Sequence, residues 1–269
     1  MAIRVWGLLF IMAAVVGVLF LAPAPATAQS AAAKAIPRLP DGKPDFNGVW
    51  ARPRVADITR DATGCGSGTQ GCTQKGSGPL PFTALGEQLN KAPKFDYTAF
   101  CLPWGYTRSM QTEYPLEIIQ TPRRLAYLYE SNNIFHVIPT DGRQLPRDIE
   151  PSWMGESVGR YDGDTLVIDT RGFNGKTTLD VGAEHPTSAA LHIVERIRHI
   201  DADHLAYDIT IEDETILTKP VTNSRTWVRM KPGEELMEYF CMENNKDLLD
   251  GHLDHLRDEA YRKFFGLDQ

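Results

Sequence analysis

Between residues 116 and 242 the sequence repeats one pattern, in which short runs of alternating apolar and polar residues are separated by turn residues. The clearest case joins Ser157–Tyr161 to Thr165–Thr170 through Asp162-Gly163. This dipeptide favours a tight hairpin because both of its positions tolerate a positive φ. The pattern is typical of antiparallel strands that each bury one face.

These turns predict about nine strands after residue 115, preceded by a first strand at Asp45–Trp50. The later strands are expected at Leu116–Gln120, Leu125–Glu130, Ile134–Ile138, Ser157–Tyr161, Thr165–Thr170, Leu191–Ile200, Leu205–Glu212, Arg225–Met230 and Leu236–Met242. No strand–helix–strand alternation accompanies them, which argues against the α/β class. A single antiparallel meander of this size closes into a barrel or folds into a sandwich, because both arrangements hide the edge strands.

Two segments interrupt this pattern. Residues 51–100 are rich in Gly, Pro and Ser, and we expect a long surface excursion there with a short helix at Thr83–Lys91. Near the C-terminus, apolar residues recur at steps of three and four, which predicts an amphipathic helix within residues 246–269. The β domain itself is expected to span residues 45–245.

The first 28 residues have the pattern of a secretory signal peptide. Arg4 precedes an apolar run from Val5 to Leu21, and Ala26-Thr27-Ala28 forms an A-x-A cleavage site. An uncleaved N-terminal anchor is the alternative, although the run is short for a membrane span. We therefore expect a periplasmic or secreted protein that has no membrane span after cleavage and begins with a Pro- and Ala-rich linker over residues 29–44.

Charge narrows the choice of partner. The chain has 28 Lys and Arg against 35 Asp and Glu, a net charge of −7, which argues against a nucleic-acid partner. We predict no metal site and no cofactor, and the pattern leaves the oligomeric state open. A small organic molecule is the expected partner.

Export implies oxidising conditions, in which the four cysteines can form disulfides. Four cysteines allow three pairings, and we predict Cys65–Cys72 as a local clip and Cys101–Cys241 as a long-range bond. The long-range bond is expected to contribute roughly 5 kcal/mol and the clip about half of that. Metal binding by the cysteines is the rival interpretation, but no C-x-x-C spacing is present.

Several motifs carry a family resemblance. They are Pro44-Asp45-Phe46-Asn47-Gly48-Val49-Trp50, Ile119-Gln120-Thr121-Pro122, Asp141-Gly142-Arg143, Glu195-Arg196, Glu238-Tyr239-Phe240-Cys241-Met242-Glu243 and, above all, the hairpin Gly155–Thr170. Over residues 45–245 the chain resembles a large and essentially uncharacterised family of exported bacterial proteins. The resemblance implies a lipocalin-like antiparallel barrel of about eight or nine strands, and it carries over no catalytic residue.

Gly155-Glu156-Ser157-Val158-Gly159 matches the G-x-S-x-G pattern of a nucleophile elbow. Such an elbow needs a helix directly after the serine, because the turn between strand and helix exposes the nucleophile. A hairpin follows here instead. We therefore interpret Ser157 as a small residue of a strand where backbones lie close.

Glu195 is the candidate catalytic residue. Alternation places it on the same face as Leu191, Ile193 and Ile197, so it points into the barrel if that face is the interior. A buried carboxylate must be paired, or its pKa rises and it becomes a candidate acid or base. The structural alternative is an ion pair with an interior arginine, for which Arg143, Arg160 and Arg225 are candidates.

Seven further residues are predicted to bind the ligand, either as polar anchors or as an aromatic lining. They are Arg143, Arg160, Trp104, Trp153, Trp227, Glu238 and His136. Core packing is the alternative for each tryptophan, and a hydrogen-bonded core position is the alternative for His136.

Three functional hypotheses follow. The first is an exported barrel that binds a small, largely apolar organic molecule. The second is a cofactor-independent lyase, isomerase or hydrolase that uses Glu195 as its acid or base. The third is an interaction module of the cell envelope, with the 51–100 excursion and the C-terminal helix as contact surfaces.

Overall fold

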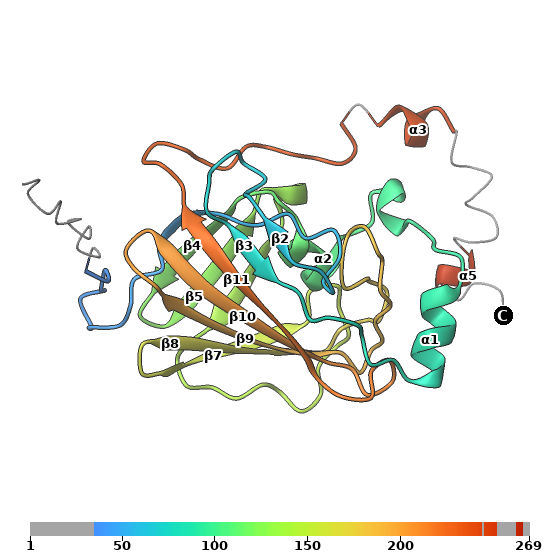
Figure 1. Cartoon of the computed structure of the whole chain (residues 1–269), viewed down its shortest axis with the longest axis horizontal. Coiled ribbons are helices and arrows are strands. Elements are labelled where there is room, and N and C mark those ends of the chain that lie inside the picture. The colour runs from blue at the N-terminus through green and yellow to red at the C-terminus, as the bar shows by residue number, and fades with distance from the viewer. Residues whose placement is uncertain (1–34, 244, 252–261, 266–269) are drawn as a thin grey trace, which may run out of the picture. The chain divides into compact units, whose positions relative to one another are not determined.

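The computed structural model of the chain describes residues 35–243, 245–251 and 262–265 (Figure 1). The predicted signal peptide lies outside the described residues. Most of the predicted C-terminal helix also lies outside them, and its described parts are the short helices α3 (Lys246–Leu249) and α5 (Arg262–Phe265).

The fold is mainly β, as predicted: an antiparallel sheet that closes almost completely into a barrel (Figure 1). Its strands are β1 (Gly48–Ala51), β2 (Ala62–Thr63), β3 (Thr73–Lys75), β4 (Leu116–Thr121), β5 (Arg124–Tyr129), β6 (Phe135–Pro139), β7 (Glu156–Asp162), β8 (Thr165–Arg171), β9 (His192–His199), β10 (His204–Glu212) and β11 (Val221–Arg229). The barrel wall follows the order β6-β5-β4-β1-β11-β10-β9-β8-β7, and the short strands β2 and β3 attach to β11.

This order corrects the expectation of a single meander. Strands β4 to β6 form one meander and β7 to β11 form another, and β1 joins them by pairing with both β4 and β11. Trp50 of β1 lies opposite Leu116 on one side and Arg229 on the other. Local turn signals cannot predict this pairing, because its partners are distant in the sequence.

Strands β6 and β7 end the order, and no backbone pairing joins them in the described chain. They nevertheless lie side by side, because a Cβ atom added to Gly159 of β7 would lie 3.2 Å from Cγ2 of Ile138 on β6. We call this unpaired junction the seam.

The prediction of a last strand at Leu236–Met242 is wrong. Residues 231–243, which we call the strap, form no strand after β11. Met237 and Phe240 of the strap are largely exposed. Apolar alternation does not make a strand here, because β11 already pairs with β1, β3 and β10.

The helix predicted at Thr83–Lys91 is confirmed as α1 (Ala84–Lys91), with the Thr83 hydroxyl accepting a hydrogen bond from the Gly86 amide at 3.0 Å. A second helix, α2 (Gly105–Gln111), was not predicted. All seven of its residues are buried, including the polar Thr107, Arg108, Ser109 and Gln111, so it does not divide into the apolar and exposed polar faces that helical periodicity detects. Two short 3-10 helices, η1 (Tyr97–Phe100) and η2 (Ser131–Asn133), complete the described elements.

Both predicted disulfides are present. Cys65 and Cys72 have their Cα atoms 5.0 Å apart, and Cys101 and Cys241 have theirs 5.5 Å apart. Two disulfides are typical of proteins that mature in an oxidising compartment. Among the helices in the described part of the chain, none has the length and apolar character needed to cross a membrane.

Candidate functional site

Glu195 is fully buried on the inner face of β9, where alternation predicted it. Two tyrosine hydroxyls donate hydrogen bonds to its carboxylate. Tyr207, from the neighbouring strand β10, donates at 2.8 Å, and Tyr106 donates from α2. We call Glu195, Tyr106 and Tyr207 the carboxylate cluster.

Burial dominates the electrostatics of this cluster. Desolvation raises the pKa of Glu195 to about 7, and the hydrogen bonds from both tyrosines and the charge of Arg225 oppose this rise. Burial also raises the pKa of each tyrosine well above its usual value. Glu195 therefore changes its charge near neutral pH, while its two partners stay protonated.

Glu195 is paired with these two phenols and not with an interior arginine, which was the structural alternative expected from the sequence. Arg225 is buried, but its guanidinium donates to Met110 O at 2.8 Å, to Gln74 Oε1 at 2.9 Å and to Gln111 Oε1. It therefore fastens α2 and β3 to the barrel wall and acts on Glu195 only through its charge. The other two candidates, Arg143 and Arg160, are exposed.

His136 faces inward from β6 and crosses the seam. Its Nε2 lies 2.6 Å from the hydroxyl of Ser157 on β7, and that hydroxyl lies 2.6 Å from the hydroxyl of Thr170 on β8. Burial lowers the pKa of His136 to about 4, so the ring is neutral at pH 7. The Tyr106 ring meets the His136 ring edge-on, with the centroids 5.0 Å apart.

Ser157 therefore has a histidine partner that the sequence did not predict. The strand after it continues to Asp162 and turns into β8, so the helix of a nucleophile elbow is absent from this described segment. The serine links three strands of the wall.

A cavity of about 420 Å³ lies where the chain enters β6 and β7. We call it the rim cavity. Its lining is mostly apolar and comprises Pro103, Asn133, Ile134, Phe135, Ser152, Trp153 and Met154. Phe135 is 66% exposed, although it is large and apolar. Of the tryptophans predicted to bind a ligand, Trp153 is the one that lines this cavity.

A second cavity of about 550 Å³ lies at the other end of β6. We call it the arginine cavity, because Arg123, Arg124 and Arg143 line it together with a single carboxylate, Asp141. Arg143 donates to Asp141 at 2.7 Å, and Arg123 lies 3.6 Å from the same carboxylate. The predicted ligand residue Arg143 therefore lies on the outside of the barrel.

The other predicted ligand residues do not come together. Trp227 is buried in the core and stacks on Tyr207, with ring centroids 4.4 Å apart. Trp104 is half-buried beside Arg108 and Tyr114. Glu238 is exposed on the strap, which overturns its inward placement because that placement required a strand.

Tyr106, Tyr207, Phe135 and Arg124 were not predicted. Tyr207 had a signal, since it alternates with the apolar residues Leu205 and Ile209 on β10. Tyr106 had none, because its helix was not recognised. Phe135 also had a signal. Neighbouring residues of a strand point to opposite faces, so an inward His136 implies that Phe135 points outward and is exposed.

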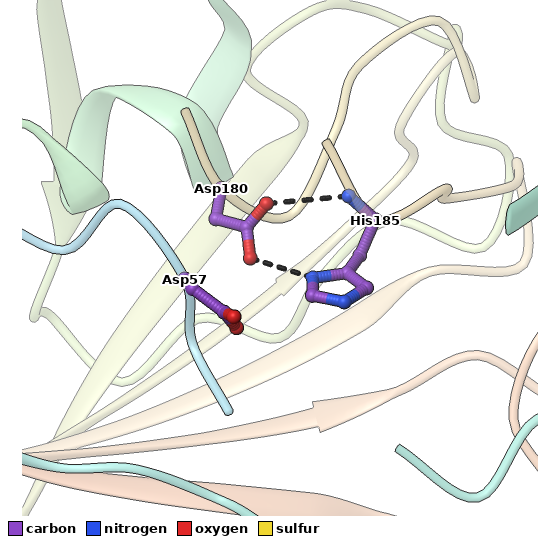
Figure 2. A group of neighbouring side chains, drawn as sticks. All are labelled: Asp57, Asp180 and His185. Atoms are coloured by element: carbon purple, nitrogen blue, oxygen red, sulfur yellow. Dashed lines mark hydrogen bonds and ion pairs between the residues drawn. The ribbon is translucent and has the colours of Figure 1, made fainter. Parts of the chain in front are cut away.

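One further group of potential metal ligands comprises Asp57, Asp180 and His185 (Figure 2). The Asp180 carboxylate already accepts hydrogen bonds from His185 Nδ1 at 2.6 Å, from the His185 amide at 3.2 Å and from the Ile58 amide at 3.0 Å. Asp57 accepts from Thr59 and pairs with Arg60. These contacts already tie Asp180 to His185 and to the Ile58 backbone, so we interpret the group as a brace between two loops.

The comparisons with known proteins leave the site to be interpreted from its geometry alone. No protein-family model matches the chain, and no curated protein matches it significantly.

Proposed function

We propose that this protein is an exported barrel that binds a small, largely apolar organic molecule in the rim cavity. The observation that carries the proposal is the cavity itself, with its apolar lining and a volume of about 420 Å³. Sites for small molecules have volumes of roughly 300–1,000 Å³ and mostly apolar walls with a few polar groups. Asn133 and Ser152 are the polar residues of this lining.

The exposure of Phe135 supports the same proposal. A phenylalanine side chain that leaves water contributes about 1.5–3 kcal/mol, and Phe135 is 66% exposed without a ligand. A molecule that covers Phe135 would gain part of this free energy. The two disulfides and the predicted signal peptide support export to an oxidising compartment.

The test uses the uncharged fluorescent compound N-phenyl-1-naphthylamine. We expect it to bind the folded protein with a rise in its emission and with energy transfer from Trp153. Phe135→Ser should weaken binding roughly tenfold, since about 1.4 kcal/mol of apolar contact corresponds to that factor. Trp153→Phe should reduce the energy transfer more than the affinity.

The matched control is Ile200→Ser, which removes an apolar side chain that is likewise exposed but lies directly after β9. This variant should bind the compound as the wild type does. Equal loss of binding in Phe135→Ser and Ile200→Ser, or no binding to the wild type, would contradict the proposal.

A second candidate function is acid–base catalysis at Glu195. Its pKa of about 7 favours this candidate, because an acid or base works best when its pKa lies near the working pH. The substrate would have to replace the Tyr106 hydroxyl at the carboxylate. The test is carbodiimide labelling with glycine ethyl ester at pH 6, mapped by mass spectrometry. Labelling of Glu195 in the folded protein would show that a small molecule reaches this carboxylate and would support catalysis there. An unlabelled Glu195 in a protein whose surface carboxyls are labelled would contradict this candidate function.

A further inference from the structure

The outer face of β6 connects the two cavities. Phe135, Val137 and Pro139 alternate along this strand, so their side chains share the face that points away from His136 and Ile138. Phe135 lines the rim cavity, and Val137 and Pro139 line the arginine cavity. The four steps from Phe135 to Pro139 span about 13 Å at the usual rise of a strand.

The surface between the cavities is apolar and open to solvent. Val137 is 40% exposed. It lies opposite Ala126 of β5, and Ala126 lies opposite Ile119 of β4, which is 44% exposed. These outward residues form a row beside Phe135. Contiguous exposed apolar surface of this kind marks a binding surface more often than scattered single residues do.

We call the apolar surface along Phe135, Val137 and Pro139 the apolar strip. Its end at Pro139 is positively charged. The arginine cavity holds three guanidinium groups against one carboxylate, on a chain whose net charge is −7. Asp141 pairs with Arg123 and Arg143, whereas the Arg124 side chain has no hydrogen bond or ion pair with another described residue. Arg124 lies opposite Pro139 in the β5–β6 ladder, at the end of the apolar strip.

We propose that the outer face of β6 binds an anionic amphiphile, whose apolar chain runs from the rim cavity over Val137 and whose charged head group lies among Arg123, Arg124 and Arg143. This inference rests on the function proposed above and specifies the chemical class of its ligand. A guanidinium is suited to a carboxylate or phosphate head group because its planar donors can bind two oxygens at once.

The pKa of Asp141 supports a role for this carboxylate in pairing with Arg143, which leaves Arg124 available to the ligand. Its hydrogen bond with Arg143 lowers that pKa to about 2, so Asp141 stays charged and holds Arg143 in place at neutral pH. The guanidinium of Arg124 is left to meet the ligand.

The test compares decanoate with 1-decanol, which share a ten-carbon chain and differ in charge. Each is titrated against the wild-type protein carrying N-phenyl-1-naphthylamine, and displacement is followed by the loss of fluorescence. We expect decanoate to displace the compound at a lower concentration than decanol. Arg124→Gln should weaken decanoate binding roughly two- to fivefold, the range for one exposed charge pair, and should leave decanol unchanged.

Arg198→Gln is the matched control, because Arg198 is exposed on β9 and has no ion pair with another described residue. Equal displacement by decanoate and decanol, or an equal effect of both arginine variants, would overturn the anionic head group while leaving the apolar site intact. If N-phenyl-1-naphthylamine does not bind at all, the proposed function fails first.

Because the site proposed above takes a small molecule, we assign the head group to a free fatty acid, and binding to a membrane lipid is the outcome that would overturn this assignment. Co-sedimentation with phosphatidylglycerol vesicles, compared with phosphatidylcholine vesicles, separates these sources. Binding to anionic vesicles that Arg124→Gln reduces would indicate a lipid in a membrane. Decanoate binding without vesicle binding would indicate a free fatty acid.

Discussion

The ring of His136 and the hydroxyl of Ser157 lie 2.6 Å apart across the seam, where the barrel wall has no backbone pairing. This hydrogen bond joins the first strand of the wall to the last. Thr170 extends it to a third strand. Closure of the barrel therefore depends partly on side chains, and these side chains can be changed one at a time.

Ser157→Ala removes the hydroxyl that links His136 to Thr170. The buried ring nitrogen of His136 and the buried hydroxyl of Thr170 then lose their shared partner. Such a change costs about 1–3 kcal/mol, which urea denaturation should detect as a lower midpoint. Ser224→Ala is the matched control, since Ser224 donates to Asp208 on the exposed face of β11. Equal losses in both variants would contradict a special role for the seam.

Glu195→Gln should remove the contribution of this carboxyl to the pH dependence of folding. The folded protein holds the Glu195 pKa at about 7, above its ordinary 4.5, so it favours the neutral carboxyl. The stability from this group is full below pH 4.5 and falls as the pH rises towards 7, by roughly 3 kcal/mol in total. Relative to wild type, the variant should gain stability between pH 4.5 and 7, measured by urea denaturation. A constant difference between the two proteins would exclude this raised pKa.

His136→Asn should remove a contribution to the pH dependence of stability that is opposite in sign to that of Glu195. Burial lowers the His136 pKa from 6.5 to about 4, so the folded protein favours the neutral ring. The stability from this group is full above pH 6.5 and falls as the pH drops towards 4, by about 3 kcal/mol. The variant should therefore lose less stability than wild type on acidification. Since Glu195 and His136 oppose each other over nearly the same range, their effects on the wild type largely cancel.

NMR titration of the His136 ring protons provides an independent measurement. A midpoint close to 4 agrees with burial in the seam, and a midpoint near 6.5 would mean that the seam opens to water. His204, which is partly exposed and pairs with Asp201, provides a second histidine signal in the same spectra.

The two disulfides should differ in their effect on stability. Cys101 and Cys241 are 140 residues apart, whereas Cys65 and Cys72 are seven apart. Replacing the first pair by serine should cost roughly 5 kcal/mol and replacing the second about half of that, because the longer loop restricts the unfolded chain more. Guanidinium denaturation of the two double variants measures both losses. A larger loss for the Cys65–Cys72 pair would show that local native contacts, and not loop length, dominate.

The sequence by itself determined the features that arise from neighbouring residues. Alternation and turn residues predicted most of the strands, since each hairpin joins residues that are close in the sequence. The same alternation placed Glu195 inside, and cysteine number and spacing were enough to choose the two disulfides that the structure contains.

Only the tertiary structure decided which distant residues meet. The insertion of β1 between β4 and β11 closes the wall and leaves the seam at β6 and β7, and no local pattern encodes that choice. Helix α2 has only seven residues and buries its polar side chains as well as its apolar ones, so apolar periodicity could not predict the helix or Tyr106 as the partner of Glu195. The strap has the alternation of a strand, but β11 before it is already paired on both edges, which left Glu238 outside.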